Sequence, residues 1–339
     1  MSAKYGLDIG TMNVRLSAAG EKKILSQKNA VTIRNRTSII GYGDDAWDMF
    51  EKAPENVEVI FPVVDGVVSD IEKMQLILEF MYKEINNGRM IKGSEFLISV
   101  PTDTTEVEKR AFHELVAYSK IRPSDIAIVE KSVADAVGCG LDIKNASGNI
   151  IVNIGAGSTD ISVVSLGGIV LCNTIRTGGN AFNEAIISAL KAQSGRLIGM
   201  KMAEQLKIKL CDLSKEPAHK EASVFARVME TGLPLRSVVS SEIINSAITP
   251  FIDNIVDVIK RTLEKTPPEL AADIEENGIY VIGGSANIKN LDSYISDRIG
   301  LDVEIIPDPI NCTIRGLTSI LTEPALASLK RYPQEKEYN

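Results

Sequence analysis

Two short segments of the chain, residues 5–13 and 151–160, repeat one pattern, and this repetition constrains the fold more than any other feature of the sequence. Each is an apolar stretch with a polar residue two positions before a glycine, and a hydroxyl residue follows that glycine within three positions. Bare glycines in a turn expose backbone N–H groups to an anion, and the hydroxyl adds a donor. Two copies, each opening one half of the chain, predict a duplicated α/β domain that holds the phosphates of a nucleotide between its halves.

The candidate nucleotide-binding residues lie in three strand-to-turn glycine motifs. The first two motifs are expected to grip the phosphates from opposite sides, and the third to pass close to the base and ribose, where a side chain would clash. The residues are Asp8, Gly10, Thr11, Met12 and Asn13 in the first motif, Asn153, Gly155, Ala156, Gly157, Ser158 and Thr159 in the second, and Gly283, Gly284, Ser285 and Ala286 in the third. One such turn alone is more typical of a tight hairpin, whereas three at this spacing favour a nucleotide site.

The length, composition and net charge of the chain exclude several classes of protein. A chain of 339 residues, 44% hydrophobic and 24% charged, fits two α/β domains of an ordinary soluble globular protein. The net charge of -8 argues against a nucleic-acid binder, and two histidines with four widely spaced cysteines argue against a zinc site. The chain enters a strand almost at once and has no apolar run of roughly 18 residues, so we expect a cytoplasmic protein.

Strands alternate with helices in both halves, which predicts α/β domains with mainly parallel sheets covered on both faces. The expected domain I covers residues 1–140, with a small inserted subdomain at about 34–64. The expected domain II covers residues 141–322, with an insert at about 181–240, and residues 323–339 form a C-terminal tail. The predicted strands cover residues 4–9, 14–19, 23–33, 96–100, 126–129, 149–154, 160–166, 169–176, 279–282 and 303–306.

Several of the predicted helices have recognisable ends. A helix from residue 71 to about 86 carries apolar residues at spacings of three and four, and Ser69 with Glu72 forms a capping box at its start. Thr105 with Glu108 caps a second helix that runs to about residue 120. Gly167 and Gly168 form a hairpin turn. The remaining predicted helices cover residues 132–140, 180–193, 200–211, 240–265 and 287–298, with a last one from about 310.

Together with longer stretches, these motifs resemble the actin-like ATPases, the superfamily of actin, the heat-shock chaperone ATPases and the sugar kinases. More narrowly, the chain is similar to MreB, the bacterial actin of rod-shape determination, over nearly its whole length. The match at residues 262–274 is not expected in chaperones or sugar kinases. The other specific stretches are residues 65–70, 100–111, 161–169, 183–187 and 203–208.

The resemblance implies roles for several residues. Asp8 would organise a magnesium ion through water, and the first two motifs would meet the β- and γ-phosphates of ATP from two sides. Glu204 and Lys207, one helical turn apart, would hydrogen-bond the ribose and flank the adenine, although the spacing alone favours a surface ion pair. Asp70 stands where the family has a carboxylate near the attacking water, and it is also placed as a first-turn acid that suits a helix dipole.

Two positions depart from the family pattern. MreB has two glutamates and a proline where this chain has Glu130, Lys131 and Ser132, and the second glutamate orients the hydrolytic water; Asn153 replaces an aspartate. An ammonium group cannot accept a proton from water. The two changes make the pocket three charge units more positive, so we expect it to hold the nucleotide anion firmly, with less dependence on magnesium, and to cleave it poorly. Compensation by Glu130 or Asp70 stays open as the alternative.

The resemblance implies an ATP-binding protein that forms head-to-tail filaments at the inner face of the membrane and supports cell shape, with itself and other MreB-like subunits as partners. A weak membrane contact is expected at Met90 and Ile91, two apolar residues flanked by Arg89 and Lys92. The alternative is that Met90 and Ile91 fold back onto the core.

Three other functions remain open from the sequence. A nucleotide-locked scaffold or co-polymer that never hydrolyses ATP is supported by Lys131 and Asn153. A small-molecule kinase of the same superfamily would need a catalytic carboxylate in a substrate pocket and usually has larger inserts. A chaperone would need a peptide-binding domain.

Overall fold

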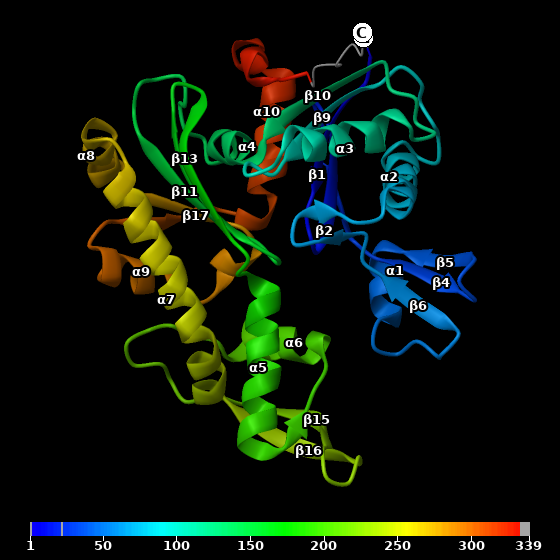
Figure 1. Cartoon of the computed structure of the whole chain (residues 1–339), viewed down its shortest axis with the longest axis vertical. Coiled ribbons are helices and arrows are strands. Elements are labelled where there is room, and N and C mark those ends of the chain that lie inside the picture. Colours follow the sequence, from blue (N-terminus) through cyan, green and yellow to red (C-terminus); the bar gives the residue numbers. More distant parts are fainter. Residues whose placement is uncertain (1, 22, 333–339) are drawn as a thin grey trace. The chain divides into compact units, whose positions relative to one another are not determined.

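The computed structural model of the protein describes residues 2–21 and 23–332 (Figure 1). Contacts divide the chain into two units. The first comprises the chain up to Ser147, the segment Val164–Cys172 and the segment that starts at Ile310; the second comprises Gly148–Val163 and Asn173–Pro309. Each unit contains strands of a five-stranded sheet and carries a small sheet of its own, so the two halves repeat one plan.

The sheet of the first unit has the strand order β10-β9-β1-β2-β3 and is mixed. Strand β1 runs parallel to β9, and β9 to β10, whereas β2 is antiparallel to both β1 and β3. The strands are β1 (Lys4–Ile9), β2 (Asn13–Ala18), β3 (Ile24–Lys28), β9 (Glu95–Val100) and β10 (Asp125–Glu130). The parallel trio β1, β9 and β10 brings the polar residues at the ends of these strands to one edge of the sheet.

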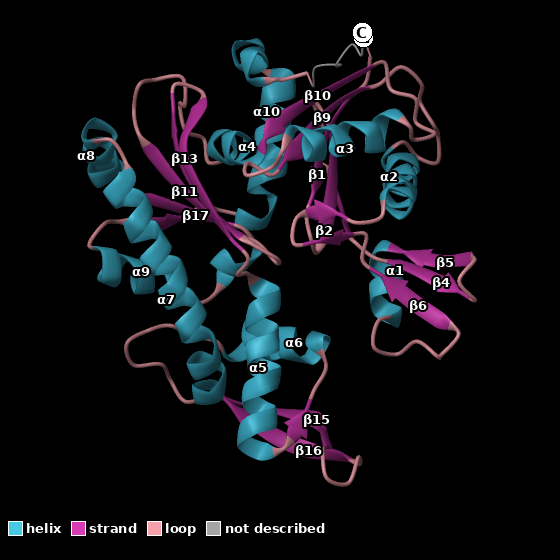
Figure 2. Ribbon diagram, viewed as in Figure 1, coloured by secondary structure: helices cyan, strands magenta, loops and turns pink. Residues whose placement is uncertain are grey.

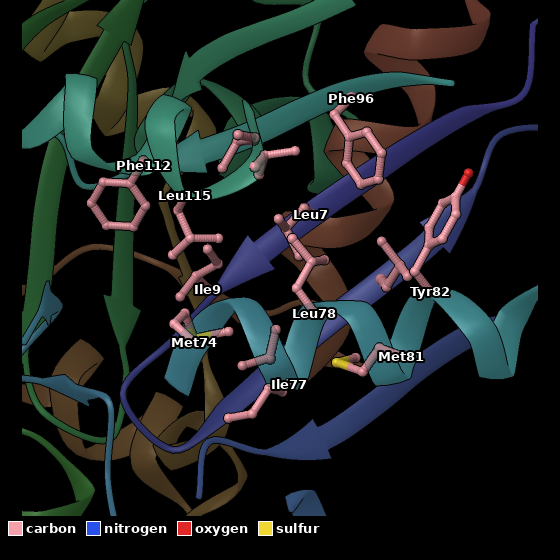
Figure 3. Packing of buried hydrophobic residues seen from close by; sticks show 14 of the residues in the cluster. Leu7, Ile9, Met74, Ile77, Leu78, Met81, Tyr82, Phe96, Phe112 and Leu115 are labelled. Carbon is pink, nitrogen blue, oxygen red and sulfur yellow. The ribbon is translucent and has the colours of Figure 1, made fainter. Parts of the chain in front are cut away.

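The longer helices of this unit are α2 (Ile71–Ile85), α3 (Glu106–Ala117), α4 (Lys131–Gly138) and α10 (Cys312–Thr322). Helix α2 packs its apolar stripe, including Met74, Leu78 and Met81, against the sheet beside Leu7 and Ile9 (Figure 3). All five of these side chains are buried, as is Ile85, which confirms the predicted stripe from Met74 onward; Ile71, predicted as its first member, is 39% exposed. Burial on this scale fixes the middle of α2 against β1.

The start of α2 differs from the prediction. Its N-cap is Asp70, whose carboxylate accepts a hydrogen bond of 3.0 Å from the backbone N–H of Lys73, so the predicted capping box of Ser69 and Glu72 is wrong. The hydroxyl of Ser69 instead donates to the carbonyl of Pro62, across the hairpin of β7 (Val63–Val64) and β8 (Val67–Val68). That hairpin contact keeps Ser69 outside the helix. The capping box of Thr105 and Glu108 on α3 is confirmed.

The small sheet of the first unit has the order β5-β4-β6, with α1 (Gly43–Met49) packed beside it (Figure 2). Its strands are β4 (Val31–Arg34), β5 (Ser38–Tyr42) and β6 (Val57–Ile60). The single strand predicted over residues 23–33 is therefore wrong, because the chain breaks at Asn29. The Asn29 side chain donates to the carbonyls of Gly10 and Thr11, which fixes a turn there.

The other five-stranded sheet has the order β13-β12-β11-β17-β18. Strand β11 runs parallel to β17, and β17 to β18. The strands are β11 (Asn149–Ile154), β12 (Thr159–Ser165), β13 (Gly168–Ile175), β17 (Ile279–Ile282) and β18 (Val303–Ile305). The turn between β12 and β13 is Leu166-Gly167, both with positive φ, one residue before the predicted pair, because Gly168 already belongs to β13.

The helices of the second unit are α5 (Gly179–Ser194), α6 (Met200–Leu210), α7 (Ser241–Lys265), α8 (Pro268–Asn277) and α9 (Leu291–Ile299). Helix α8 was not predicted: Pro267 and Pro268 end α7 and also begin a new helix, since proline suits the first helical turn. Helix α9 begins later than predicted because Gly284–Asn287 forms a short 3-10 helix, η1. The small sheet consists of β14 (Arg196–Leu197), β15 (Glu221–Val228) and β16 (Pro234–Ser240).

The chain ends with two short 3-10 helices, η2 (Pro309–Asn311) and η3 (Pro324–Leu329), on either side of α10. Arg331 then pairs with Ile128 of β10 through two backbone hydrogen bonds of 2.8 Å. The expected C-terminal tail thus covers the outer edge of β10 up to Tyr332, and residues 333–339 lie outside the described residues. Among the helices that the structure describes, none is both long and apolar enough to cross a bilayer.

Candidate functional site

Asp8 is the centre of the site residues in the first unit. It lies near the end of β1 and is 2% exposed. Its Oδ1 accepts a hydrogen bond of 2.9 Å from Ser99 on β9 and lies 3.7 Å from the Nζ of Lys131, while its Oδ2 accepts from Nη1 of Arg15 on β2 at 3.2 Å. Two cations and a hydroxyl therefore surround one buried carboxylate.

These partners keep Asp8 ionised. Burial raises the pKa of Asp8, but the charges of Lys131 and Arg15 and the hydrogen bonds from Ser99 and Arg15 outweigh it, so the pKa lies below its ordinary value. A buried carboxylate of this kind is stable only with its cations in place. The carboxylate that the sequence assigned to magnesium is thus already neutralised by side chains.

The turn that follows β1 leaves backbone donors unused. Gly10 donates to the carbonyl of Asn13, and the hydroxyl of Thr11 accepts from the N–H of Gly66 at 3.0 Å. The carbonyl of Met12 accepts from Asn29 at 2.9 Å. Within residues 2–21 and 23–332, the N–H groups of Thr11 and Met12 donate to no protein acceptor, so the turn can bind an anion.

The other carboxylates assigned to this half are engaged elsewhere. The Glu130 side chain lies 3.4 Å from the ammonium of Lys109 and 3.4 Å from Nη1 of Arg331. Asp70 caps α2 and also binds the ammonium of Lys73 at 2.6 Å. Burial raises the pKa of Asp70, but the hydrogen bonds and the charge of Lys73 lower it by more. The pKa therefore lies below its ordinary value, and Asp70 is held as an anion.

The second-unit turn repeats the backbone plan of the first. Asn153 is buried near the end of β11, and Gly155 donates to the carbonyl of Ser158 at 2.9 Å, as Gly10 does to Asn13. In the part of the chain that the structure describes, the N–H groups of Ala156, Gly157 and Ser158 donate to no protein acceptor. The hydroxyl of Thr159, which is fully buried, donates to the carbonyl of Thr177 and so faces the protein.

The third glycine motif packs directly on the second. Gly283 has a φ of +91°, and a Cβ there would lie 2.4 Å from the carbonyl oxygen of Ile154 and 2.7 Å from Oδ1 of Asn153. Ser285 and Ala286 are buried in η1, which begins at Gly284. The close approach that the sequence expected of this glycine is therefore made to the second turn itself.

Helix α5 supports the same turn. The N–H groups of Gly179 and Asn180 donate to the carbonyls of Gly155 and Ala156 at 2.9 and 2.8 Å. A Cβ at Gly178 would lie 2.7 Å from the Gly155 carbonyl oxygen, so only glycine fits there. The Gly178-Gly179 pair was missed by the sequence analysis, although two glycines between a strand and a helix are a signal for close backbone packing.

Lys207 on α6 contacts the first residues of α5. Its Nζ donates to the carbonyl of Gly179 at 2.9 Å and lies over the ring of Phe182 at 5.9 Å. Burial lowers the pKa of Lys207 to about 8, although the charge of Glu204 opposes the shift. Glu204 is less buried than Lys207 and lies one turn before it on α6.

The predicted membrane loop lies at the opposite end of α2 from Asp70. Met90 packs against the core cluster of the first unit, whereas Ile91 is 39% exposed. The carbonyl of Ile91 accepts from the hydroxyl of Tyr82 at 2.9 Å, which ties the loop to α2. Of the two apolar residues, Ile91 is the more exposed, and Met90 is only partly buried.

Sequence reasoning also missed the partners of Asp8. Arg15 lies opposite Asp8 in the register of β1 and β2, and Ser99 opposite it in the register of β1 and β9. A charged residue between Val14 and Leu16 in an apolar strand is a usable signal of a buried ion pair. Among the described residues, no group of three or more histidine, cysteine, aspartate or glutamate side chains is arranged to hold a metal ion.

Comparison with known proteins identifies the family. A family model described as "MreB/Mbl protein" matches residues 2–328. The chain belongs to the MreB/Mbl family. The cell shape-determining protein Mbl of Bacillus subtilis is 32% identical to it over 332 residues, which cover 98% of each chain.

Solved structures of the family have the same fold. MreB5 of Spiroplasma citri bound to AMPPNP is similar to this chain with a TM-score of 0.90 and 31% identity, covering 97% of this chain and 98% of that one. The same protein bound to ADP gives a TM-score of 0.89 at 32% identity, covering 94% and 96%. The predicted duplicated, actin-like α/β fold with small inserted sheets is confirmed, with mixed central sheets.

Proposed function

We propose that this MreB/Mbl protein binds ATP through the glycine turns of both units and assembles, with nucleotide bound, into head-to-tail filaments that support cell shape. The observation that carries the proposal is the pair of turns whose N–H groups, at Thr11 and Met12 and at residues 156–158, donate to no acceptor in the described part of the chain. Relatives support it: Mbl of Bacillus subtilis is a cell shape-determining protein, and MreB5 of Spiroplasma citri binds AMPPNP and ADP.

The two turns would share the phosphates, because each offers amide donors beside a strand end and helix α5 fixes the second turn. Asn13 and Thr159 border the turns, and the third motif at Gly283–Ala286 would lie beside the base. Lys207, with Glu204 one turn earlier on α6, would contact the ribose and adenine. Nucleotide binding would close the units and prepare subunit surfaces for heterologous association.

Hydrolysis is proposed to be slow. A water needs a carboxylate to align it and accept its proton, and Lys131 stands where the family has that carboxylate. The two neighbouring acids that could replace it are engaged by cations: Glu130 by Lys109 and Arg331, and Asp70 by Lys73. A scaffold that never hydrolyses ATP, alone or as a co-polymer with another family member, is favoured by the same ion pairs and is the second candidate.

One experiment tests the polymer and separates the two candidates. Sedimentation and negative-stain imaging with ATP, with ADP and without nucleotide are combined with phosphate release in the same samples. Filaments with slow phosphate release support the main proposal, and filaments with none support the locked scaffold. An absence of filaments under every condition would contradict both.

We also propose a weak membrane contact at Ile91, with electrostatic help from Arg89 and Lys92. A single partly exposed apolar residue binds weakly, and a filament would multiply the contact through avidity. Co-sedimentation with anionic liposomes should weaken for Ile91→Ser and not for Val107→Ser, which alters an exposed apolar residue on α3. Equal liposome binding by both variants and the unaltered protein would contradict a membrane contact at Ile91.

A further inference from the structure

The ammonium group of Lys131 lies beside Asp8, where a metal ion held by that carboxylate would have to bind. It is the first residue of α4, immediately after β10, and its Nζ lies 3.7 Å from Oδ1 of Asp8. Arg15 reaches the other oxygen of the same carboxylate at 3.2 Å. The first phosphate turn begins two residues after Asp8, so both charges lie at the end of the strand that carries the turn.

A magnesium ion fits these residues poorly. Magnesium requires an octahedral set of oxygens and keeps several of its waters, so a carboxylate that organises it must accept hydrogen bonds from those waters. Both oxygens of Asp8 already have protein partners, Ser99 with Lys131 on one and Arg15 on the other. A divalent cation placed there would also be repelled by the ammonium and the guanidinium.

The matching position of the second turn carries no negative charge either. Asn153 is a neutral amide that is buried beside Gly283. The carboxylates of Asp70 and Glu130 are bound to lysines or arginine, as described above. A hydrated magnesium ion would therefore find one neutralised carboxylate where the family pattern has more acidic surroundings.

We infer that the Lys131 ammonium takes the place of the divalent cation, so that this protein binds nucleoside triphosphate without metal. An ammonium is a compact cation with three donors, which allows one group to hold a carboxylate and to donate to phosphate oxygens. The inference rests on the proposed nucleotide binding and adds that the bound species is the metal-free nucleotide. Asp8 then positions Lys131 instead of a metal ion.

The test is a titration with ATP in excess magnesium and again in EDTA. For the unaltered protein the two dissociation constants should agree within about threefold. Lys131→Met, which keeps the length and apolar stem but removes the charge, should weaken binding in EDTA by about tenfold or more. Lys131→Arg, which keeps a cation, should retain most of the binding in EDTA.

A matched control removes a lysine that also pairs with a carboxylate. Lys120 lies 3.2 Å from Glu79 and its side chain is 77% exposed, so Lys120→Met should leave both dissociation constants unchanged. Thermal unfolding in the same buffers shows that each variant is folded.

The outcomes separate the inference from the proposed function. Binding by the unaltered protein that falls tenfold or more in EDTA would overturn the inference while leaving nucleotide binding intact. Equal behaviour of Lys131→Met and the unaltered protein in EDTA would also overturn it, because the charge would then have no role. Failure to bind ATP in either buffer would instead contradict the proposed function.

Discussion

The two glycine turns share a backbone plan and differ in electrostatics. In both, a glycine N–H donates to a carbonyl three residues later, and the N–H groups between them donate to no acceptor among the described residues. The first turn follows a buried carboxylate that two cations neutralise, whereas the second follows a neutral amide. The comparison teaches that a duplicated scaffold can keep its backbone donors while the charged groups beside them diverge.

The supports of the two turns differ as well. Side chains hold the first turn, since Asn29 binds its carbonyls and Gly66 binds the hydroxyl of Thr11. Close backbone packing holds the second, through Gly178, the N-cap of α5, and Gly283 of the third motif. Substitutions that change charge should therefore destabilise the first turn most, and substitutions that add side-chain volume should destabilise the second turn most.

The largest effect is expected from Asp8→Asn. This change leaves the Arg15 and Lys131 charges without their carboxylate, and removing one partner of a buried pair costs about 3 kcal/mol. Urea unfolding measures the loss. Asn153→Ala at the matching position of the second turn removes no charge and should cost about 1 kcal/mol. Equal losses at the two positions would show that the turns do not differ in electrostatics.

The next effect is expected from Gly283→Ala. A residue with φ of +91° whose Cβ would lie 2.4 Å from a backbone oxygen must shift the second turn, and such strain costs about 2 kcal/mol. Gly284→Ala is the matched control, because a Cβ there meets nothing within 4 Å. Urea unfolding should separate the two variants, and similar values would contradict the packing argument.

A smaller effect is expected from pH. The pKa of Lys207 in the folded protein, about 8, lies below its ordinary value of 10.5, so the unfolded chain binds more protons between these two pH values. Stability should therefore rise with pH across this window, by at most about 1.4 kcal/mol per pH unit. Lys207→Met should flatten that rise in urea unfolding series. An equal slope in the variant would assign the pH dependence to other groups.

The sequence predicts what depends on local pattern. The strand ends at Asp8 and Asn153, the stripe on α2 and the capping box at Thr105 follow from glycine placement, helical spacing and side-chain capping, and the structure has all of them. The third motif was expected to approach a ligand closely, and the structure adds that Gly283 approaches the second turn.

The sequence does not predict contacts set by sheet order. Asp8, Ser99 and Lys131 meet because β1, β9 and β10 are neighbours, and no spacing along the chain states this. The cap of α2 was misassigned for a similar reason, since Ser69 is held by Pro62 across a hairpin. Lys131 stands where the family has a glutamate, which indicated that it affects the nucleotide site. Only the fold shows that it lies beside Asp8.

The measurement that tests the account most directly is phosphate release from ATP by assembled protein, compared between the unaltered chain, Lys131→Glu and Lys131→Met. The account predicts very slow release from the unaltered protein and at least about a tenfold increase for Lys131→Glu, which restores a carboxylate able to align water. Lys131→Met should stay slow, because it removes the ammonium without adding a base. Release from the unaltered protein that equals that of Lys131→Glu would contradict the account.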